Sequence, residues 1–228
     1  MDLHGYGPHL LTGVWLTIKL GLLSLVVAGL LGILGALAKL SSVPPLRLLA
    51  QIYTTLVRGI PDLVLMLIIF YGGQIALNQA GEAWGLGYID VNPFIAGVLT
   101  LGVIFGAYMT ETFRGAILAV PKGQMEAARA LGMGYAVAMR RVILPQVLPG
   151  VLSGSLIVFA LSASALAIPG LLGGRRLKMV ATLIYDEYLH ELNWPLGAAI
   201  ALVLLVINLA VMLSYNAVLE GAYKKRMG

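Results

Sequence analysis

The sequence predicts an all-α, polytopic membrane protein with about five transmembrane helices, and two observations support this fold class. Hydrophobic residues make up 60% of the 228 residues and charged residues only 11%, which is too apolar for a soluble domain of this length. In addition, five stretches are about as long and as apolar as a membrane-spanning helix must be. These stretches cover roughly residues 20–38, 60–77, 93–110, 149–168 and 196–219.

The five stretches differ in how sharply the sequence bounds them. No basic segment and no evident cleavage site accompany the first, so we expect a retained helix and not a signal peptide. Apolar residues continue from the second stretch back toward Leu48, so we expect its helix to extend that way. The third and fourth have sharp polar flanks, and the fifth precedes a basic tail.

The distribution of lysine and arginine between the short loops predicts the orientation of the chain. Nine of these residues lie on one side of the expected membrane and four on the other, which places the N-terminus outside and the C-terminus in the cytoplasm. The same residues account for the net charge of +5. Because they lie at membrane ends without an accompanying aromatic platform, we expect no nucleic-acid partner.

The chain shows no internal repeat and no linker, so we expect a single transmembrane domain over residues 1–228. Two loops are longer than the others. One is a cytoplasmic insert at about 121–145, and the other is an outer loop at about 173–194. Loops of this length usually have a function.

The cytoplasmic insert is expected to open with a short helix over 124–131, after Pro121 breaks the preceding span. Glu126 would lie in the first turn, where the helix dipole favours a carboxylate. Ala127 and Ala128 form helices well and have little bulk, so that a partner surface can approach closely.

The insert then turns and continues as a second short helix. Gly132 is expected to end the first helix in the left-handed conformation that glycine readily adopts. The second helix should cover 135–144 and stop at Pro145. An ordinary solvated loop between two spans is the alternative interpretation of this segment.

The pattern of the insert resembles the coupling loop of ATP-binding-cassette (ABC) importer permeases. The matching residues are Glu126, Ala127, Ala128, Gly132, Ile143 and Pro145, in the sequence EAARALGMGYAVAMRRVILP. The resemblance implies a type I ABC importer permease core, in which a cytoplasmic ATPase moves the membrane helices through this loop.

Longer segments suggest a subfamily. Residues 53–66, 106–116 and 120–124 look like permeases of the polar amino acid uptake family, nearest to the histidine and lysine/arginine/ornithine importers, and this similarity covers about 10–145. The last third, at 148–155, 168–176 and 193–199, is similar to permeases for polyamines, aminophosphonates and ferric iron. The resemblance therefore implies import of polar or basic amino acids, with polyamines or another small solute as the alternative.

Charged residues close to the spans are candidates for a polar inner gate. They form two pairs at helical spacing, i,i+4 and i,i+3, and glycine and proline weaken the helix beside the first pair. Snorkelling of interfacial side chains together with local ion pairing is the alternative. The expected gate residues are Arg58, Gly59, Pro61, Asp62, Glu111 and Arg114.

The sequence offers little for covalent chemistry, so we expect a transport subunit and no enzyme. A serine hydrolase would need a base beside a buried serine, yet the histidines lie outside the spans. No glycine-rich loop is followed by Lys-Ser/Thr, so the chain should not bind ATP. We expect no cofactor and no metal site, because His4, His9 and His190 are scattered.

The resemblance also implies partners and a location. The partners would be a cytoplasmic ABC ATPase dimer carrying ATP–Mg, a second homologous or identical permease subunit, and an extracytoplasmic solute-binding protein. The chain would lie in the lipid bilayer of a bacterial inner membrane as a multi-pass protein. Arg175 and Arg176 in the outer loop would contact the binding protein. An ATPase-independent secondary transporter or channel, or a membrane scaffold or non-functional chimera, are the competing interpretations.

Overall fold

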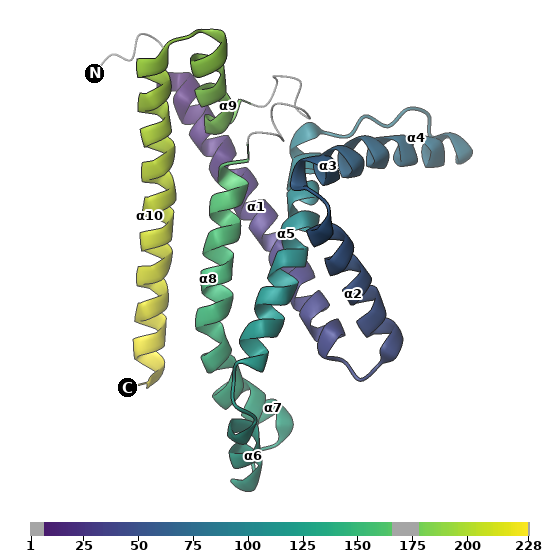
Figure 1. The fold of residues 1–228 in the computed structure, drawn as a ribbon, viewed down its shortest axis with the longest axis vertical. Coiled ribbons are helices and arrows are strands. Elements are labelled where there is room, and N and C mark those ends of the chain that lie inside the picture. Colours follow the sequence, from purple (N-terminus) through teal and green to yellow (C-terminus); the bar gives the residue numbers. More distant parts are fainter. Residues whose placement is uncertain (1–6, 166–177, 228) are drawn as a thin grey trace. The chain divides into compact units, whose positions relative to one another are not determined.

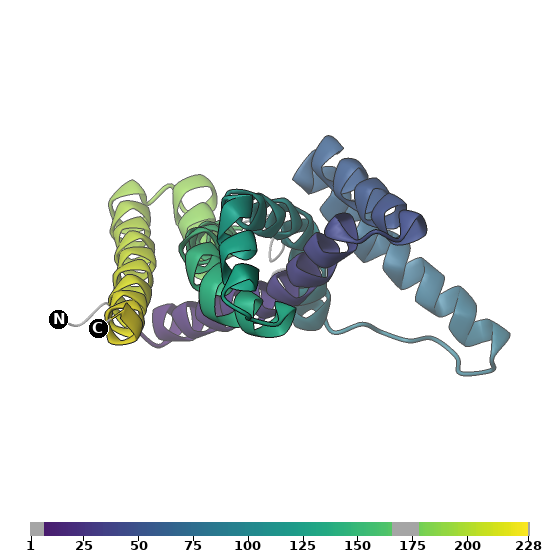
Figure 2. The ribbon, with the colours of Figure 1, turned by 90° about the horizontal axis from the view of Figure 1, so that it is seen from below.

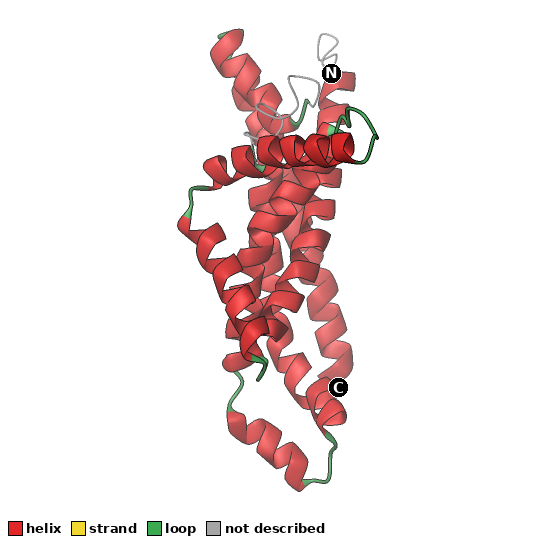
Figure 3. Ribbon diagram, turned by 90° about the vertical axis from the view of Figure 1, so that its right-hand side faces the viewer, coloured by secondary structure: helices red, strands yellow, loops and turns green. Residues whose placement is uncertain are grey.

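The structure is a computed structural model that describes residues 7–165 and 178–227, and every regular element within these ranges is a helix (Figures 1 and 3). The expected all-α fold class is confirmed. Five helical segments are long and apolar enough to cross a membrane, at Gly7–Leu40, Asp62–Ala83, Pro93–Leu118, Tyr135–Ala163 and Trp194–Tyr215. In chain order the elements are α1 (Gly7–Leu40), α2 (Pro44–Gly59), α3 (Asp62–Leu67), η1 (Ile68–Gly72), α4 (Gly73–Ala83), α5 (Pro93–Leu118), α6 (Lys122–Ala130), α7 (Tyr135–Ala138), η2 (Met139–Ile143), α8 (Leu144–Ala163), α9 (Val180–Tyr185), η4 (Asp186–His190) and α10 (Trp194–Met227).

The expected backward extension of the second span toward Leu48 is wrong. Helix α2 is separate, because the backbone becomes extended at Ile60 (φ −110°, ψ 138°) before α3 begins at Asp62. A residue that precedes proline is pushed out of the helical region by the proline ring, and Pro61 follows Ile60 directly. The membrane-spanning segment therefore begins at Asp62 and not before it.

Contacts divide the chain into two compact units, residues 22–159 and residues 1–21 with 160–228. In the first unit, α5 is the central helix, and side chains along most of its length are buried. Helix α2 packs against α5 (Figure 1). The polar stretch at the end of α5 remains helical to Leu118, beyond the limit of about residue 110 that hydropathy alone suggested.

Small residues allow neighbouring helices of this unit to approach α5 closely. A Cβ added at Gly32 of α1 would lie 2.6 Å from Cβ of Met109, and one at Gly154 of α8 would lie 2.5 Å from Cγ2 of Thr112. Both distances are shorter than any normal contact. Packing through small residues is the usual way in which membrane helices associate, since lipid supplies no hydrophobic force between them.

The second unit contains α9, η4 and α10, together with residues 7–21 of α1. Its apolar core is formed by Val180, Leu183 and Ile200. The hydroxyl of Thr17 accepts a hydrogen bond of 3.1 Å from the backbone N–H of Val180 and so fixes the start of α9. The segment at 173–194 that was expected to be an outer loop therefore holds helical structure from Val180 to His190, while Arg175 and Arg176 lie outside the described residues.

Candidate functional site

The insert between α5 and α8 is a helix–turn–helix unit. Its first helix, α6, packs against α7 and η2 beyond the end of α5 (Figures 1 and 2). The predicted break at Pro121 is confirmed, but α6 already begins at Lys122. Glu126 is consequently the fifth residue of α6 and lies outside its first turn, so the expected interaction with the helix dipole is lost.

The turn after α6 has the conformation that the sequence predicts. Gly132 has a φ of +76°, in the left-handed region that favours glycine. Its backbone N–H donates to the carbonyl of Arg129 at 2.9 Å, and the N–H of Met133 donates to the carbonyl of Ala128 at 3.0 Å. These two bonds form a Schellman motif, which satisfies carbonyl groups at the end of α6. The turn is thus fixed by backbone geometry.

The coupling-loop residues predicted from the sequence separate into exposed and buried groups. Glu126, Ala127 and Gly132 are exposed. Ala128 and Ile143 are 3% and 5% exposed, because they pack inside the insert. Ala128 therefore cannot offer its small side chain to a partner, as had been expected of it.

Three exposed apolar side chains of the insert were not anticipated. Leu131, Tyr135 and Val137 are 78%, 60% and 44% exposed. The guanidinium of Arg129 lies over the ring of Tyr135 at 5.9 Å and bridges the turn. Exposed apolar patches on a protein surface mark sites of contact with other proteins or with a membrane. The signal was available in the sequence, since apolar residues flank the turn glycine.

The second helix of the insert does not stop at Pro145, which corrects the expected helix over 135–144. Helical structure continues from Tyr135 through η2 into α8 as far as Ala163. The π-helical turn η2, Met139–Ile143, lies directly before the proline. A wider turn at that place accommodates a residue that lacks an N–H donor, and so the helix can continue. The insert and the fourth span are therefore one continuous helical rod.

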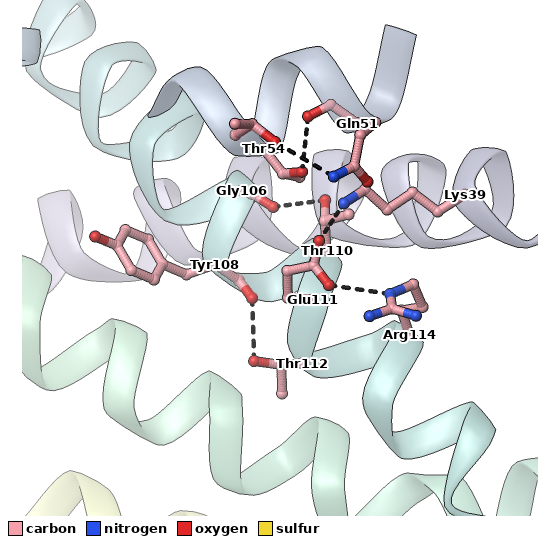
Figure 4. A network of polar contacts seen from close by, with 10 residues as sticks. Lys39, Gln51, Thr54, Gly106, Tyr108, Thr110, Glu111, Thr112 and Arg114 are labelled. Atoms are coloured by element: carbon pink, nitrogen blue, oxygen red, sulfur yellow. Dashed lines mark hydrogen bonds and ion pairs between the residues drawn. The ribbon is translucent and has the colours of Figure 1, made fainter. Parts of the chain in front are cut away.

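Four of the six predicted gate residues, Arg58, Gly59, Glu111 and Arg114, line an open polar pocket of about 520 Å³ between α1, α2 and α5, whereas Pro61 and Asp62 lie outside its lining. Glu111 of α5 pairs with Lys39 of α1 and, at 3.0 Å, with Nε of Arg114 (Figure 4). The expected i,i+3 pair is therefore confirmed. The residues that line this polar pocket are Lys39, Gln51, Thr54, Thr55, Arg58, Gly59, Tyr108, Glu111 and Arg114.

Arg58 and Asp62 do not form the expected i,i+4 pair. The break at Pro61 separates α2 from α3, so helical spacing does not apply across it. Both side chains instead meet Tyr108 of α5: the guanidinium of Arg58 lies 5.6 Å from the ring, and the hydroxyl donates to Asp62 at 3.4 Å. Tyr108 therefore connects the two sides of the helix break.

Three residues of α2 that line the pocket, Gln51, Thr54 and Thr55, were not predicted from the sequence, whereas Arg58 and Gly59 were. Gln51, Thr54, Thr55 and Arg58 follow the spacing i, i+3, i+4, i+7, which marks a polar helix face. That signal was present in the sequence, but it was obscured by the assumption that the segment continued a membrane span. Lys39 was also missed, because nothing in the sequence links it to a residue 72 positions away.

A second pocket of about 370 Å³ lies in the unit that contains α9 and η4. Its lining includes Lys178 and the three carboxylates of Asp186, Glu187 and Glu191. Glu187 is only 3% exposed. These residues belong to the described portion of the 173–194 segment in which partner contacts were expected.

The sequence is similar to known transport proteins over most of its length. Residues 28–221 match the family described as "Binding-protein-dependent transport system inner membrane component". The chain is 50% identical over 152 residues, 67% of either chain, to the histidine/lysine/arginine/ornithine transport system permease protein HisQ of Escherichia coli. It is 44% identical over 144 residues to the nopaline transport system permease protein NocQ of Agrobacterium fabrum, covering 62% of this chain and 61% of that one.

Solved structures agree with this similarity. A crystal structure of an amino acid ABC transporter with histidines matches at a TM-score of 0.70 and 27% identity, covering 98% of this chain and 97% of that one. A chain of an inward-facing MetNI methionine ABC transporter matches at a TM-score of 0.73 and 17% identity, covering 95% and 97%, which supports the fold alone.

Proposed function

Since the chain belongs to the family of binding-protein-dependent transport system inner membrane components, we propose that it imports basic amino acids of the histidine, lysine, arginine and ornithine class. The chain is a multi-pass inner-membrane permease subunit of an ABC importer. The observation that carries the substrate proposal is the 50% identity to HisQ. The resemblance of the last third to polyamine permeases makes polyamines the alternative that the experiment must separate.

The family works with an ATPase and a solute-binding protein. For this chain, the insert at 121–145 is the surface that would receive an ATPase dimer carrying ATP–Mg. Exposed Leu131 and Tyr135 would enter the partner, while the glycine turn holds them in place. Because helical structure runs without interruption from Tyr135 to Ala163, movement of the docked insert would be transmitted directly to the fourth span.

The polar pocket would serve as the inner gate. Arg58 and Asp62 flank the helix break and both contact Tyr108, so a change at the break would move charged groups relative to α5. Glu111 with its two basic partners would hold α1 and α5 together in one state of the cycle. Ionisable groups within candidate spans commonly mark a transport pathway, and Lys39, Glu111 and Arg114 belong to such helices, which supports this assignment.

Five spans provide too little wall to enclose a path for an amino acid, so a second permease subunit, identical or homologous, would complete the pathway. The insert would face the cytoplasm, with the N-terminus outside and the C-terminus inside. The outer segment, including Arg175 and Arg176, would contact the solute-binding protein.

Uptake by the assembled importer tests the substrate. The chain is expressed with the other subunits of a histidine importer in cells that lack their own basic amino acid uptake, and entry of labelled arginine and histidine is measured. The proposal expects uptake that depends on ATP hydrolysis and that excess lysine or ornithine suppresses. Uptake of labelled putrescine without uptake of arginine would show that the substrates are polyamines. Cells that carry the partner subunits without this chain serve as the control.

A further inference from the structure

We propose that the polar pocket between α1, α2 and α5 binds the phosphate group of an anionic membrane lipid. Its volume of about 520 Å³ is within the range of ordinary ligand sites. Binding of a lipid here is separate from the transport of a substrate and does not rest on the gate assignment.

The charge of the lining favours an oxyanion. Lys39, Arg58 and Arg114 contribute three positive charges, and Glu111 is the one carboxylate among the described lining residues. Glu111 already pairs with both Lys39 and Arg114. Asp62 accepts a hydrogen bond from the Tyr108 hydroxyl but is not a lining residue. The net charge of the cluster stays positive even when this carboxylate is counted.

The pocket also presents hydrogen-bond donors suited to phosphate. Arg114 bonds to Glu111 through Nε, and the guanidinium of Arg58 lies on the Tyr108 ring, so terminal N–H groups of both arginines remain able to donate. Guanidinium groups match the geometry of phosphate oxygens particularly well. Nε2 of Gln51 donates to the hydroxyl of Thr55 at 3.4 Å, which leaves the hydrogen of that hydroxyl directed elsewhere.

The position of the pocket along the helices indicates that its anion comes from a lipid. Lys39 precedes the last residue of α1, and Arg114 lies in the last turns of α5, which ends at Leu118. Both helices are candidate membrane spans. Basic residues at the ends of membrane helices lie at the level of the lipid headgroups, and basic pockets between such helices bind lipid phosphates.

The outer face of α2 offers a surface for the acyl chain. This face consists of Leu48, Leu49, Ile52 and Leu56, which are 60%, 65%, 46% and 57% exposed. On a helix with 3.6 residues per turn, Leu48 and Ile52 lie beside the positions that line the polar pocket. A charged recess next to an aliphatic strip fits an amphipathic ligand better than it fits a free anion.

Native mass spectrometry of the purified full-length chain tests the proposal. The wild type is titrated with phosphatidylglycerol or with phosphatidylcholine, and the retained lipid is counted. We expect the anionic lipid to be retained preferentially, and Arg58→Gln and Arg114→Gln each to weaken its retention about fivefold. Arg141→Gln, which removes the same charge from an exposed position in the insert, should leave retention unchanged.

Two further variants distinguish a lipid site from a general structural effect. Arg58→Lys keeps the charge and should retain most of the binding, while Glu111→Gln removes the carboxylate and should increase retention. A loss caused only by misfolding would not produce an increase, and circular dichroism verifies the fold of each variant. Equal retention of both lipids, or equal losses in Arg141→Gln and Arg58→Gln, would overturn the proposal.

Competition identifies the source of the anion. Inorganic phosphate or free histidine is added at millimolar concentration during the titration with phosphatidylglycerol. A bound lipid should resist both, since its acyl chain contributes to affinity. Displacement by phosphate would show that the site binds a free oxyanion. Displacement by histidine would show that it binds the carboxylate of an amino acid. Either result would refute a lipid site.

Discussion

The glycine turn of the insert allows a sharp test of the coupling mechanism, in which Gly132 is replaced by valine. Gly132 has a φ of +76°, and a Cβ added there would meet nothing within 4 Å. The cost of the substitution is therefore purely conformational. A left-handed backbone costs a residue with a side chain about 1–2 kcal/mol, and a branched Cβ places valine at the unfavourable end.

That cost has a measurable consequence for docking. Because each 1.4 kcal/mol is a factor of ten, about 1–2 kcal/mol should reduce the population of the correctly turned insert by about 5–30-fold. The apparent affinity for the partner ATPase should fall by the same factor if docking requires this turn. The assay is co-purification of the ATPase with the chain over a range of ATPase concentrations, combined with ATP hydrolysis by the reconstituted complex.

Gly134 provides the matched control. It is also open to a Cβ, but its φ of −62° and ψ of 156° are accessible to any residue. Gly134→Val should therefore leave docking close to the wild type, while Gly132→Asn should be intermediate, because asparagine tolerates the left-handed region. Equal losses of affinity in the two valine variants would refute the reasoning, as would no loss in either.

Two stability predictions concern the packing around α5, and thermal unfolding in detergent measures both. Glu111→Gln should cost about 1–3 kcal/mol, because Lys39 loses its carboxylate partner, although its side chain, which is 6% exposed, still lines an open polar pocket that water can enter. Arg114→Gln should cost less than about 1 kcal/mol, since that side chain is 38% exposed; a larger loss in Arg114→Gln than in Glu111→Gln would contradict this ranking. Gly35→Ala should cost about 1–3 kcal/mol, because its Cβ would overlap a threonine side chain of α5. Gly29→Ala on the same helix meets nothing within 4 Å and should cause no loss, so similar melting temperatures for both alanine variants would count against close packing here.

Hydropathy and turn chemistry account for most of what could be predicted. Apolar stretches of sufficient length located all five candidate spans, and the residue types around Gly132 predicted its positive φ. Both features depend on local sequence, where length and backbone preference decide the outcome. The break at Pro61 was also visible, yet its effect was underestimated, because apolar residues on both sides suggested a single continuous span.

The remaining features depend on contacts between distant residues. The pairing of Lys39 with Glu111 joins positions 72 residues apart, and no periodicity in either helix indicates it. Similarly, Ala128 and Ile143 are buried because the two helices of the insert pack together, which a pattern in one helix cannot reveal. The sequence therefore indicated which residues are candidates for the site more reliably than which residues they contact.

The insert is joined to α5 and α8, and the packing of these two helices determines how a docked ATPase would act on the gate. Only residues 119–121 separate α5 from α6, while α7 continues through η2 into α8 without a break in the helical structure. The two helices meet through small residues, since a Cβ at Gly150 would lie 3.0 Å from Cβ of Ala116, and Gly154 is similarly close to Thr112. Because this contact has no room for sliding bulky side chains, we infer that α5 and α8 move together at this level. Glu111 lies next to Thr112 on α5. Displacement of the insert would therefore shift α5 and so disturb the ion pairs that Glu111 forms with Lys39 and Arg114.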